Sequence, residues 1–433
     1  MLISFSFSNC RSFKDSNEMS MEARGIKEYK ECLIPFGSKK LLPTMAIYGK
    51  NGGGKSNVLR AFWLGVKFIC NAQKTQHENS PVPVSPFLLD NESKDKPTSF
   101  EFYYTDADTR YRYGFSATRR EIVEEHLYSA PKGQRATIFT RQKQNFYFPE
   151  NAEKKLKELI KKAVAENQLF FSVACTMNYM PCIKAMNWFR NKVIFTRDYT
   201  DLSQQIIENS ENGNMLNAIL TYAKKADVGI EDMKFEISSK TLEPKKKLPE
   251  DIPDDIKTSI MAFLKALSAS PNVSEIRLQQ GEMKVTSFHK GINKVGKSEL
   301  FPLSISDESD GTRRLMALAP AIERALECGG IIVADELETG MHPLLAEYLV
   351  SRFQNKKTNP NGAQMIFTTH DTNFLNLETL RRDQFVFVDK DADTGESELY
   401  GIDDIRSFNS SNAEKSYLLG KFGAVPNFTE GDE

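Results

Sequence analysis

The sequence lacks several features that mark whole classes of protein. No apolar run approaches the ~20 residues that a helix needs to span a bilayer, so we expect no membrane association. The start, MLISFSFSNCRSF, has no basic segment followed by an apolar block, which excludes a secretory signal. The six cysteines include no CxxC pair, which argues against a disulfide framework or a zinc site. Together these absences favour a cytoplasmic protein.

The charges give no excess of either sign, because 57 Lys and Arg residues face 58 Asp and Glu residues. Such a balance predicts no global attraction to nucleic acid, although local patches remain possible. The sequence is 40% hydrophobic and 27% charged, which is ordinary for a globular protein and excludes global disorder or a coiled-coil rod. At ~150 residues per domain, 433 residues allow two or three domains.

Short apolar segments typical of buried strands occur in both end regions of the chain, at 2–7, 44–48, 100–104, 111–115, 331–334, 364–368 and 384–388. In the last third, helical patterns lie between these segments, which predicts a mostly parallel sheet. We therefore predict one α/β domain built from residues 1–140 and 286–433. Residues 141–285 are expected to form a mainly helical insert.

The expected insert contains a lysine-rich helical pattern. Over residues 151–168, Leu156, Leu159, Ile160, Ala163 and Val164 have helical spacing, and the other face carries Lys154, Lys155, Lys157, Lys161 and Lys162. This face is either simply solvated or a contact for DNA, which requires clustered basic side chains. Residues 241–255 are charged and proline-containing and predict a loop or hinge, followed by an amphipathic helix over 256–267.

The strongest motif begins at the end of the strand over 44–48. It matches GxxxxGK[ST] and consists of Gly49, Lys50, Asn51, Gly52, Gly53, Gly54, Lys55 and Ser56, with a helix expected from Asn57. Strand, glycine-rich loop and helix are the context of a phosphate-binding P-loop. The glycines let backbone N–H groups converge on phosphates, Lys55 reaches the terminal phosphates and Ser56 can hold Mg²⁺. We therefore expect ATP and Mg²⁺ as ligands, with Asn57 at the helix start among the nucleotide-binding residues.

A second strand ends in two adjacent acids, Asp335 and Glu336. This is the Walker B pattern, in which Asp335 would contact Mg²⁺ and Glu336 would act as general base toward the attacking water. The alternative is an ordinary strand terminus with two solvated carboxylates. The P-loop upstream favours the catalytic interpretation.

Two further segments follow the order of ABC-type ATPases. Ser309, Asp310, Gly311 and Thr312 precede a helical pattern and resemble the ABC signature, which binds the γ-phosphate of a nucleotide held by another subunit. Asp310 stands where transporter ATPases have glycine, and an ordinary helix cap at Ser309 is the alternative. His370 follows the strand over 364–368, at the position of the switch histidine that contacts the γ-phosphate.

Taken together, these motifs resemble the ABC-type AAA-family ATPases related to RecF and SMC heads. The segment DGTR, the run DELETGMHP and the tail YLLGKFGAVP are similar to the RloA, AbiLi and PARIS AriA group. The resemblance implies an ABC-type P-loop ATPase sheet built from both chain ends and a homodimer or higher homo-oligomer. It also implies a role in bacterial phage defence, often beside an effector that is a TOPRIM-type nuclease or a toxin.

Other functions remain open at this point. A RecF- or SMC-like DNA-repair or DNA-maintenance ATPase that clamps DNA is the main alternative. A transporter ATPase is less favoured, because the chain has a long insert and no LSGGQ. The acids at Asp389, Asp391 and Asp393 resemble parts of a TOPRIM or EF-hand site, but they lie between two strand-like runs and predict a hairpin turn.

Overall fold

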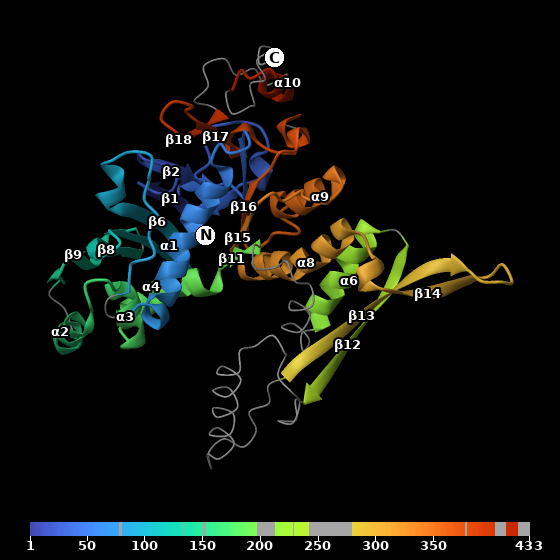
Figure 1. The fold of residues 1–433 in the computed structure, drawn as a ribbon, viewed down its shortest axis with the longest axis horizontal. Helices are drawn as coiled ribbons and strands as arrows, with labels where there is room; N and C mark the ends of the chain where they lie inside the picture. Colours follow the sequence, from blue (N-terminus) through green and yellow to red (C-terminus); the bar gives the residue numbers. More distant parts are fainter. Residues whose placement is uncertain are drawn as a thin grey trace, which may run out of the picture. The chain divides into compact units, whose positions relative to one another are not determined.

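The computed structural model describes residues 1–77, 80–131, 133–149, 153–196, 213–227, 229–241, 279–376, 379–402 and 413–422. The chain divides into two compact units, of which the first comprises Met1–Thr200 with Ala321–Glu433 and the second comprises Asp201–Pro320. Figure 1 colours both along the sequence. The expected helix over 256–267 and the loop after Thr241 lie outside the described residues.

A six-stranded sheet forms one half of the first unit, with the order β11-β15-β16-β5-β17-β18. Its parallel strands are β11 (Val193–Phe195), β15 (Ile331–Ala334), β16 (Gln364–Thr368), β5 (Thr44–Gly49) and β17 (Phe385–Lys390). The last strand, β18 (Ser397–Gly401), pairs antiparallel with β17. Every residue of β5, β15 and β16 is buried, as expected for continuous apolar runs in a sheet covered on both faces. The α/β sheet predicted from both chain ends is confirmed.

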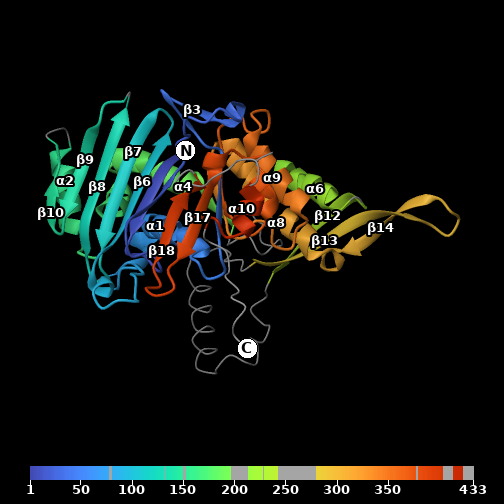
Figure 2. The same ribbon diagram turned by 90° about the horizontal axis from the view of Figure 1, so that it is seen from above.

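A seven-stranded antiparallel sheet forms the other half of this unit, in the order β10-β9-β8-β7-β6-β1-β2. Figure 2 shows its long middle strands side by side. Its strands are β1 (Leu2–Ser8), β2 (Asn17–Ser20), β6 (Thr98–Asp106), β7 (Thr109–Ala117), β8 (Ile122–Pro131), β9 (Ala136–Gln142) and β10 (Asn145–Tyr147). Alternating residues of β1 and β6 turn aromatic rings toward the core.

Helix α1 (Lys55–Thr75) links the two sheets. It contacts β5, and its Phe62 ring lies 5.0 Å from Phe5 of β1 and 5.6 Å from Phe102 of β6, measured between ring centroids. The same aromatic layer includes Phe189, 5.2 Å from Phe102. The helix that follows the glycine-rich loop is therefore held on both sides, which fixes the position of its N-terminus.

The remaining helices of the first unit cover the sheets or edges of this core. They are α2 (Lys154–Ala163), α3 (Phe170–Thr176), α4 (Met180–Asn191), α9 (Pro343–Gln354) and α10 (Ala413–Leu418). A small hairpin, β3 (Ile34–Phe36) with β4 (Lys39–Leu41), directly precedes β5 in the sequence. No helix of the described ranges is long and apolar enough to cross a lipid bilayer.

The second unit contains a helix and a three-stranded antiparallel sheet. Helix α6 (Gly213–Ala226) precedes β12 (Ile230–Thr241), β13 (Gln279–Ile292) and β14 (Ser298–Ser304). Helix α8 (Asp310–Cys328) begins here, and the division between the units falls within it, after Pro320. The unit boundaries thus differ from the insert expected over 141–285, because α2, α3 and α4 belong with the antiparallel sheet of the first unit.

The lysine pattern of α2 differs from the expected two-faced helix. Lys157 is only 3% exposed, and its ammonium lies 5.6 Å from the Phe148 ring centroid and 6.0 Å from that of Tyr179. Leu159, expected on the apolar face, is 56% exposed. A long alkyl stem lets a lysine lie along aromatic rings, and sequence spacing alone does not reveal this. The other four lysines of the pattern are half-buried or exposed.

Candidate functional site

The glycine-rich loop connects the buried end of β5 to the start of α1. Gly52 and Gly54 have φ values of +75° and +120°, which side chains disfavour. A Cβ atom at Gly54 would lie 2.7 Å from the Ser397 hydroxyl, and one at Gly49 would lie 2.4 Å from the carbonyl oxygen of Val388. The loop therefore requires glycine both for its backbone conformation and for its close approach to the hairpin of β17 and β18.

Lys55 lies inside this loop, only 6% exposed. Its ammonium donates a 2.7 Å hydrogen bond to the carbonyl of Gly49 and a 3.3 Å hydrogen bond to that of Lys50. Burial lowers the pKa of Lys55, while the carboxylates of three nearby acids, Glu336, Asp335 and Glu338, oppose this effect. The lysine is thus positioned next to the predicted acids, at the first helical residue of α1.

Asp335 accepts hydrogen bonds from two hydroxyl groups, one at the end of the P-loop and one at the end of β16. Ser56 and Thr368 donate to the same carboxylate oxygen, Oδ1, over 3.0 Å and 2.7 Å. Ser56 comes from α1, Asp335 follows β15 and Thr368 ends β16. Because neighbouring parallel strands end at the same edge of a sheet, residues far apart in sequence meet here.

Glu336 has a φ of +48°, which costs about 1–3 kcal/mol for a residue other than glycine. Its N–H donates a 2.7 Å hydrogen bond to the Thr368 hydroxyl, and its carboxylate accepts a 3.2 Å hydrogen bond from the Thr339 hydroxyl. The Glu336 side chain is exposed, two residues beyond the end of β15. Such strain at the end of a strand is common at functional sites.

His370 follows β16 and is exposed. Its N–H donates a 2.7 Å hydrogen bond to Oε1 of Glu338. The other carboxylate oxygen of Glu338 is buried and has no hydrogen-bond partner among the described residues. Burial and the charge of Lys55 lower the pKa of His370, against the opposing charges of Glu338, Glu336 and Asp335, so the ring is neutral at pH 7. The loop, the acid pair and the histidine are therefore brought together.

The segment at the start of α8 belongs to the second unit. The Ser309 hydroxyl accepts a 3.1 Å hydrogen bond from the N–H of Thr312, as a helix cap does, and lies 2.8 Å from the Thr312 hydroxyl. The side chain of Asp310 is 86% exposed and pairs with Arg313. Gly311 is buried. The Asp310 carboxylate is therefore exposed at the first residue of α8 and is paired with Arg313.

A family profile described as "AAA domain, putative AbiEii toxin, Type IV TA system" matches residues 45–376, from the buried strand β5 to the segment after His370. The chain belongs to this AAA family. It has a mixed α/β fold with a P-loop ATPase domain. No curated protein matches the sequence.

Several solved structures align with most of this AAA-family chain at low sequence identity. An Smc head bound to the C-winged helix domain of ScpA is 13% identical, with 94% of this chain and 99% of that chain covered and a TM-score of 0.38. An Smc head with coiled coil and joint from Pyrococcus yayanosii is 12% identical, with 96% and 99% covered and a TM-score of 0.37. The cbiO1 protein of Clostridium perfringens, part of the ABC transporter complex cbiONQ, is 11% identical, with 97% and 92% covered and a TM-score of 0.27.

Sequence reasoning missed the residues that brace the loop of this AAA domain. The Ser397 hydroxyl donates a 2.8 Å hydrogen bond to the carbonyl of Gly53, and Asn57 donates a 2.9 Å hydrogen bond to the Ser12 hydroxyl. Ser397 also donates its N–H to the carbonyl of Ser12 over 2.7 Å. A single serine belongs to no sequence motif, so only the fold reveals the role of Ser12 and Ser397. The sequence could have indicated Thr368, because it ends the predicted strand next to the one that ends at Asp335.

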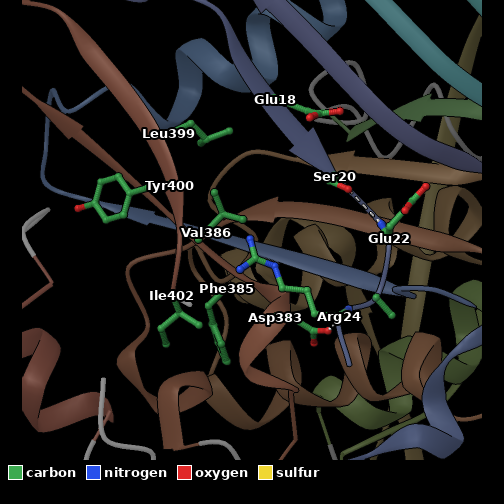
Figure 3. A pocket seen from close by; sticks show the side chains of 12 residues that line it. Glu18, Ser20, Glu22, Arg24, Asp383, Phe385, Val386, Leu399, Tyr400 and Ile402 are labelled. Atoms are coloured by element: carbon green, nitrogen blue, oxygen red, sulfur yellow. Dashed lines mark hydrogen bonds between the residues drawn. The ribbon is translucent and has the colours of Figure 1, made fainter. Parts of the chain in front are cut away.

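The pocket in Figure 3 is separate from the P-loop. It has a volume of about 380 Å³ and lies between the edge strands β2 and β18. Polar side chains, including Glu18, Glu22 and Arg24, line much of it, and the N–H of Arg24 donates to Asp383 over 2.9 Å. None of the lining residues belongs to the P-loop, the acid pair or the strand end at His370.

Proposed function

We propose that this chain binds ATP with Mg²⁺ and hydrolyses it, and that its nucleotide state controls a partner protein. The observation that carries the proposal is the double hydrogen bond to Asp335. The Ser56 and Thr368 hydroxyls meet on one oxygen of this carboxylate, next to Lys55. A P-loop serine against a strand-end aspartate is the arrangement that holds Mg²⁺ in P-loop NTPases.

The P-loop and the acid pair would bind different parts of the nucleotide and its metal ion. The N–H groups of Gly52 and Gly54 would bind phosphate oxygens, with Asn51 at the loop tip, whereas the N–H of Gly53 donates to the carbonyl of Lys50 over 3.0 Å. Lys55 would exchange its two carbonyl partners for phosphate oxygens. Bound between Ser56 and Asp335, Mg²⁺ would neutralise charge on the phosphates.

Catalysis is assigned to Glu336 and His370. Glu336 would accept the proton of the attacking water, and its side chain is exposed beyond the end of β15. Neutral His370 offers a ring N–H to the γ-phosphate. The unpartnered carboxylate oxygen of Glu338 supports a polar ligand beside this histidine.

We also propose a homodimer or higher homo-oligomer in which Ser309 and the Gly311 backbone contact a nucleotide held by another copy. Helix N-termini favour anions, and the ion pair with Arg313 offsets the charge of the exposed Asp310 carboxylate. The present role of Ser309 as a helix cap is compatible with this, because a hydroxyl oxygen can accept from its helix and donate its proton elsewhere.

The proposed partner is an effector, a TOPRIM-type nuclease or a toxin, acting in bacterial phage defence in the cytoplasm. Two things support this: the resemblance to the RloA, AbiLi and PARIS AriA group, and the description of the matching family by a toxin and a toxin–antitoxin system.

The test measures ATP binding and turnover by purified wild type, Lys55→Ala and the matched control Lys67→Ala. Lys67 lies on the same helix but is exposed over the Trp63 ring. We expect Lys55→Ala to lose ATP binding, because the phosphates lose their ammonium partner, and Lys67→Ala to keep it. Equal ATP binding by Lys55→Ala and wild type would reject the site.

Shared sites are tested by mixing Lys55→Ala with Ser309→Arg, each inactive alone. A mixed dimer retains one intact site, made from the P-loop of the Ser309→Arg chain and the signature of the Lys55→Ala chain. Partial recovery of turnover is expected. Mixed oligomers that form without recovered turnover would contradict the proposal that one shared site suffices.

A further inference from the structure

A second cluster of ligating side chains lies in the second unit, and the proposed ATP hydrolysis makes no use of it. Asp227, His289 and Glu308 each offer one oxygen or nitrogen atom, and these atoms lie within 4.8 Å of one another. They come from three places in the chain: the end of α6, strand β13 and the residue before the helix cap Ser309. Their convergence therefore depends on the fold of the whole unit.

The cluster is enclosed rather than spread over the surface. The Glu308 side chain is 3% exposed and that of His289 is 18% exposed. Nε2 of His289 lies 2.7 Å from Oε1 of Glu308, and the Ser287 hydroxyl donates to the same oxygen. A Cβ atom at Gly229 would lie 2.9 Å from Nδ1 of His289 and 3.2 Å from Oδ1 of Asp227, so glycine leaves room for both groups.

The charges of this cluster are unbalanced. The Glu308 carboxylate lies against the one imidazole, and Asp227 accepts the N–H of Gly229 over 2.8 Å. Within the described ranges no lysine or arginine forms an ion pair with either carboxylate. A buried carboxylate requires a compensating positive charge or several donors. A divalent cation would supply that charge to both carboxylates at once.

We propose that Asp227, His289 and Glu308 bind a zinc-type divalent transition-metal ion. One imidazole nitrogen and two carboxylate oxygens are a donor set that Zn²⁺ accepts, whereas all-oxygen sets suit Mg²⁺. Zn²⁺ ligands at 2.0–2.1 Å stand about 3.3 Å apart in a tetrahedron, so His289 and Glu308 would separate by roughly half an ångström. The scarcity of paired cysteines does not oppose this site, because it uses no cysteine.

This site would tie three segments together immediately before α8. Glu308 directly precedes Ser309, whose hydroxyl caps that helix. A bound ion would therefore fix the start of α8 to α6 and β13. The proposal does not depend on ATP hydrolysis, and its test measures metal binding alone.

The experiment titrates Zn²⁺ into the chelator-treated full-length protein by calorimetry. Three variants are compared with wild type: His289→Gln, Asp227→Asn and Glu308→Gln. Gln at 289 can still donate a hydrogen bond to Glu308, and Asn at 227 keeps the shape of a half-buried side chain. The matched controls are His77→Gln and His342→Gln, two exposed histidines outside the proposed sites.

We expect each ligand variant to weaken Zn²⁺ binding by about 100-fold or more, since changes even to residues around metal ligands cost 10–100-fold. The two control variants should bind as wild type does. If Glu308→Gln does not fold, Asp227→Asn and His289→Gln decide the matter. Absence of Zn²⁺ binding in wild type, or equal binding in wild type and both of these variants, would overturn the proposal and leave a hydrogen-bonded trio.

Discussion

The hydroxyl of Ser397 donates a 2.8 Å hydrogen bond to the carbonyl of Gly53, across 344 positions of sequence. The bond joins the hairpin of β17 and β18 to the middle of the P-loop, and Ser397 is 1% exposed. The loop conformation is therefore held from outside as well as by its own glycines.

Ser397→Ala is expected to weaken ATP binding without unfolding the protein. Loss of one buried hydrogen bond costs about 1 kcal/mol. This corresponds to about fivefold in affinity if the free loop relaxes and must return to its bound conformation without the bond. Fluorescent ATP-analogue titration measures this. Ser351→Ala is the control, because the Ser351 hydroxyl bonds only to its own helix, at Tyr348. Equal losses in both variants would argue against a specific brace.

The fold near the P-loop was largely predictable, whereas its bracing was not. Continuous apolar runs that end in glycine or in Asp335 define the strands and the motifs at their ends. Ser12 and Ser397 could not be found in this way, since their role arises from tertiary contacts alone. The burial of Lys157 has the same origin, because the rings of Phe148 and Tyr179 come from other segments.

Arg141 and Glu125 form an ion pair with both side chains 0% exposed. Glu125 also accepts the N–H groups of Phe170 and Phe171 at the start of α3, over 2.8 Å and 2.9 Å. Arg141→Met leaves this carboxylate without its cation, and we expect a loss of about 3 kcal/mol in the free energy of unfolding. Urea denaturation measures it, with the exposed Arg120→Met as control. A loss below that of the control would contradict the role of the pair.

The lowered pKa of His370 predicts a pH-dependent stability. Below pH 6.5, the usual value, the unfolded chain binds a proton that the folded histidine does not, so wild type loses stability as the pH falls toward the folded-state pKa. His370→Gln removes this proton binding. The stability of wild type relative to the variant should therefore decline as the pH falls through 6.5 in urea denaturation. A rising difference would show that the folded state raises the pKa of His370.

The remaining surface lysines of α2 allow a test of the DNA-clamp alternative. Replacing Lys154, Lys155, Lys161 and Lys162 with Glu should weaken duplex binding and flatten its salt dependence if this helix contacts phosphates. Lys356→Glu with Lys357→Glu, on an exposed segment after α9, is the comparison. Unchanged or absent DNA binding would assign the α2 lysines to a solvated face.

We propose that Glu336 activates water for the hydrolysis of ATP held by Lys55, Ser56 and Asp335. The most direct measurement is the identity of the nucleotide retained by Glu336→Gln after incubation with Mg²⁺ and ATP, compared with wild type and with Glu327→Gln, an exposed glutamate of α8. We expect bound ATP in Glu336→Gln and turnover to ADP in the other two proteins. ADP formed by Glu336→Gln at the wild-type rate would contradict it.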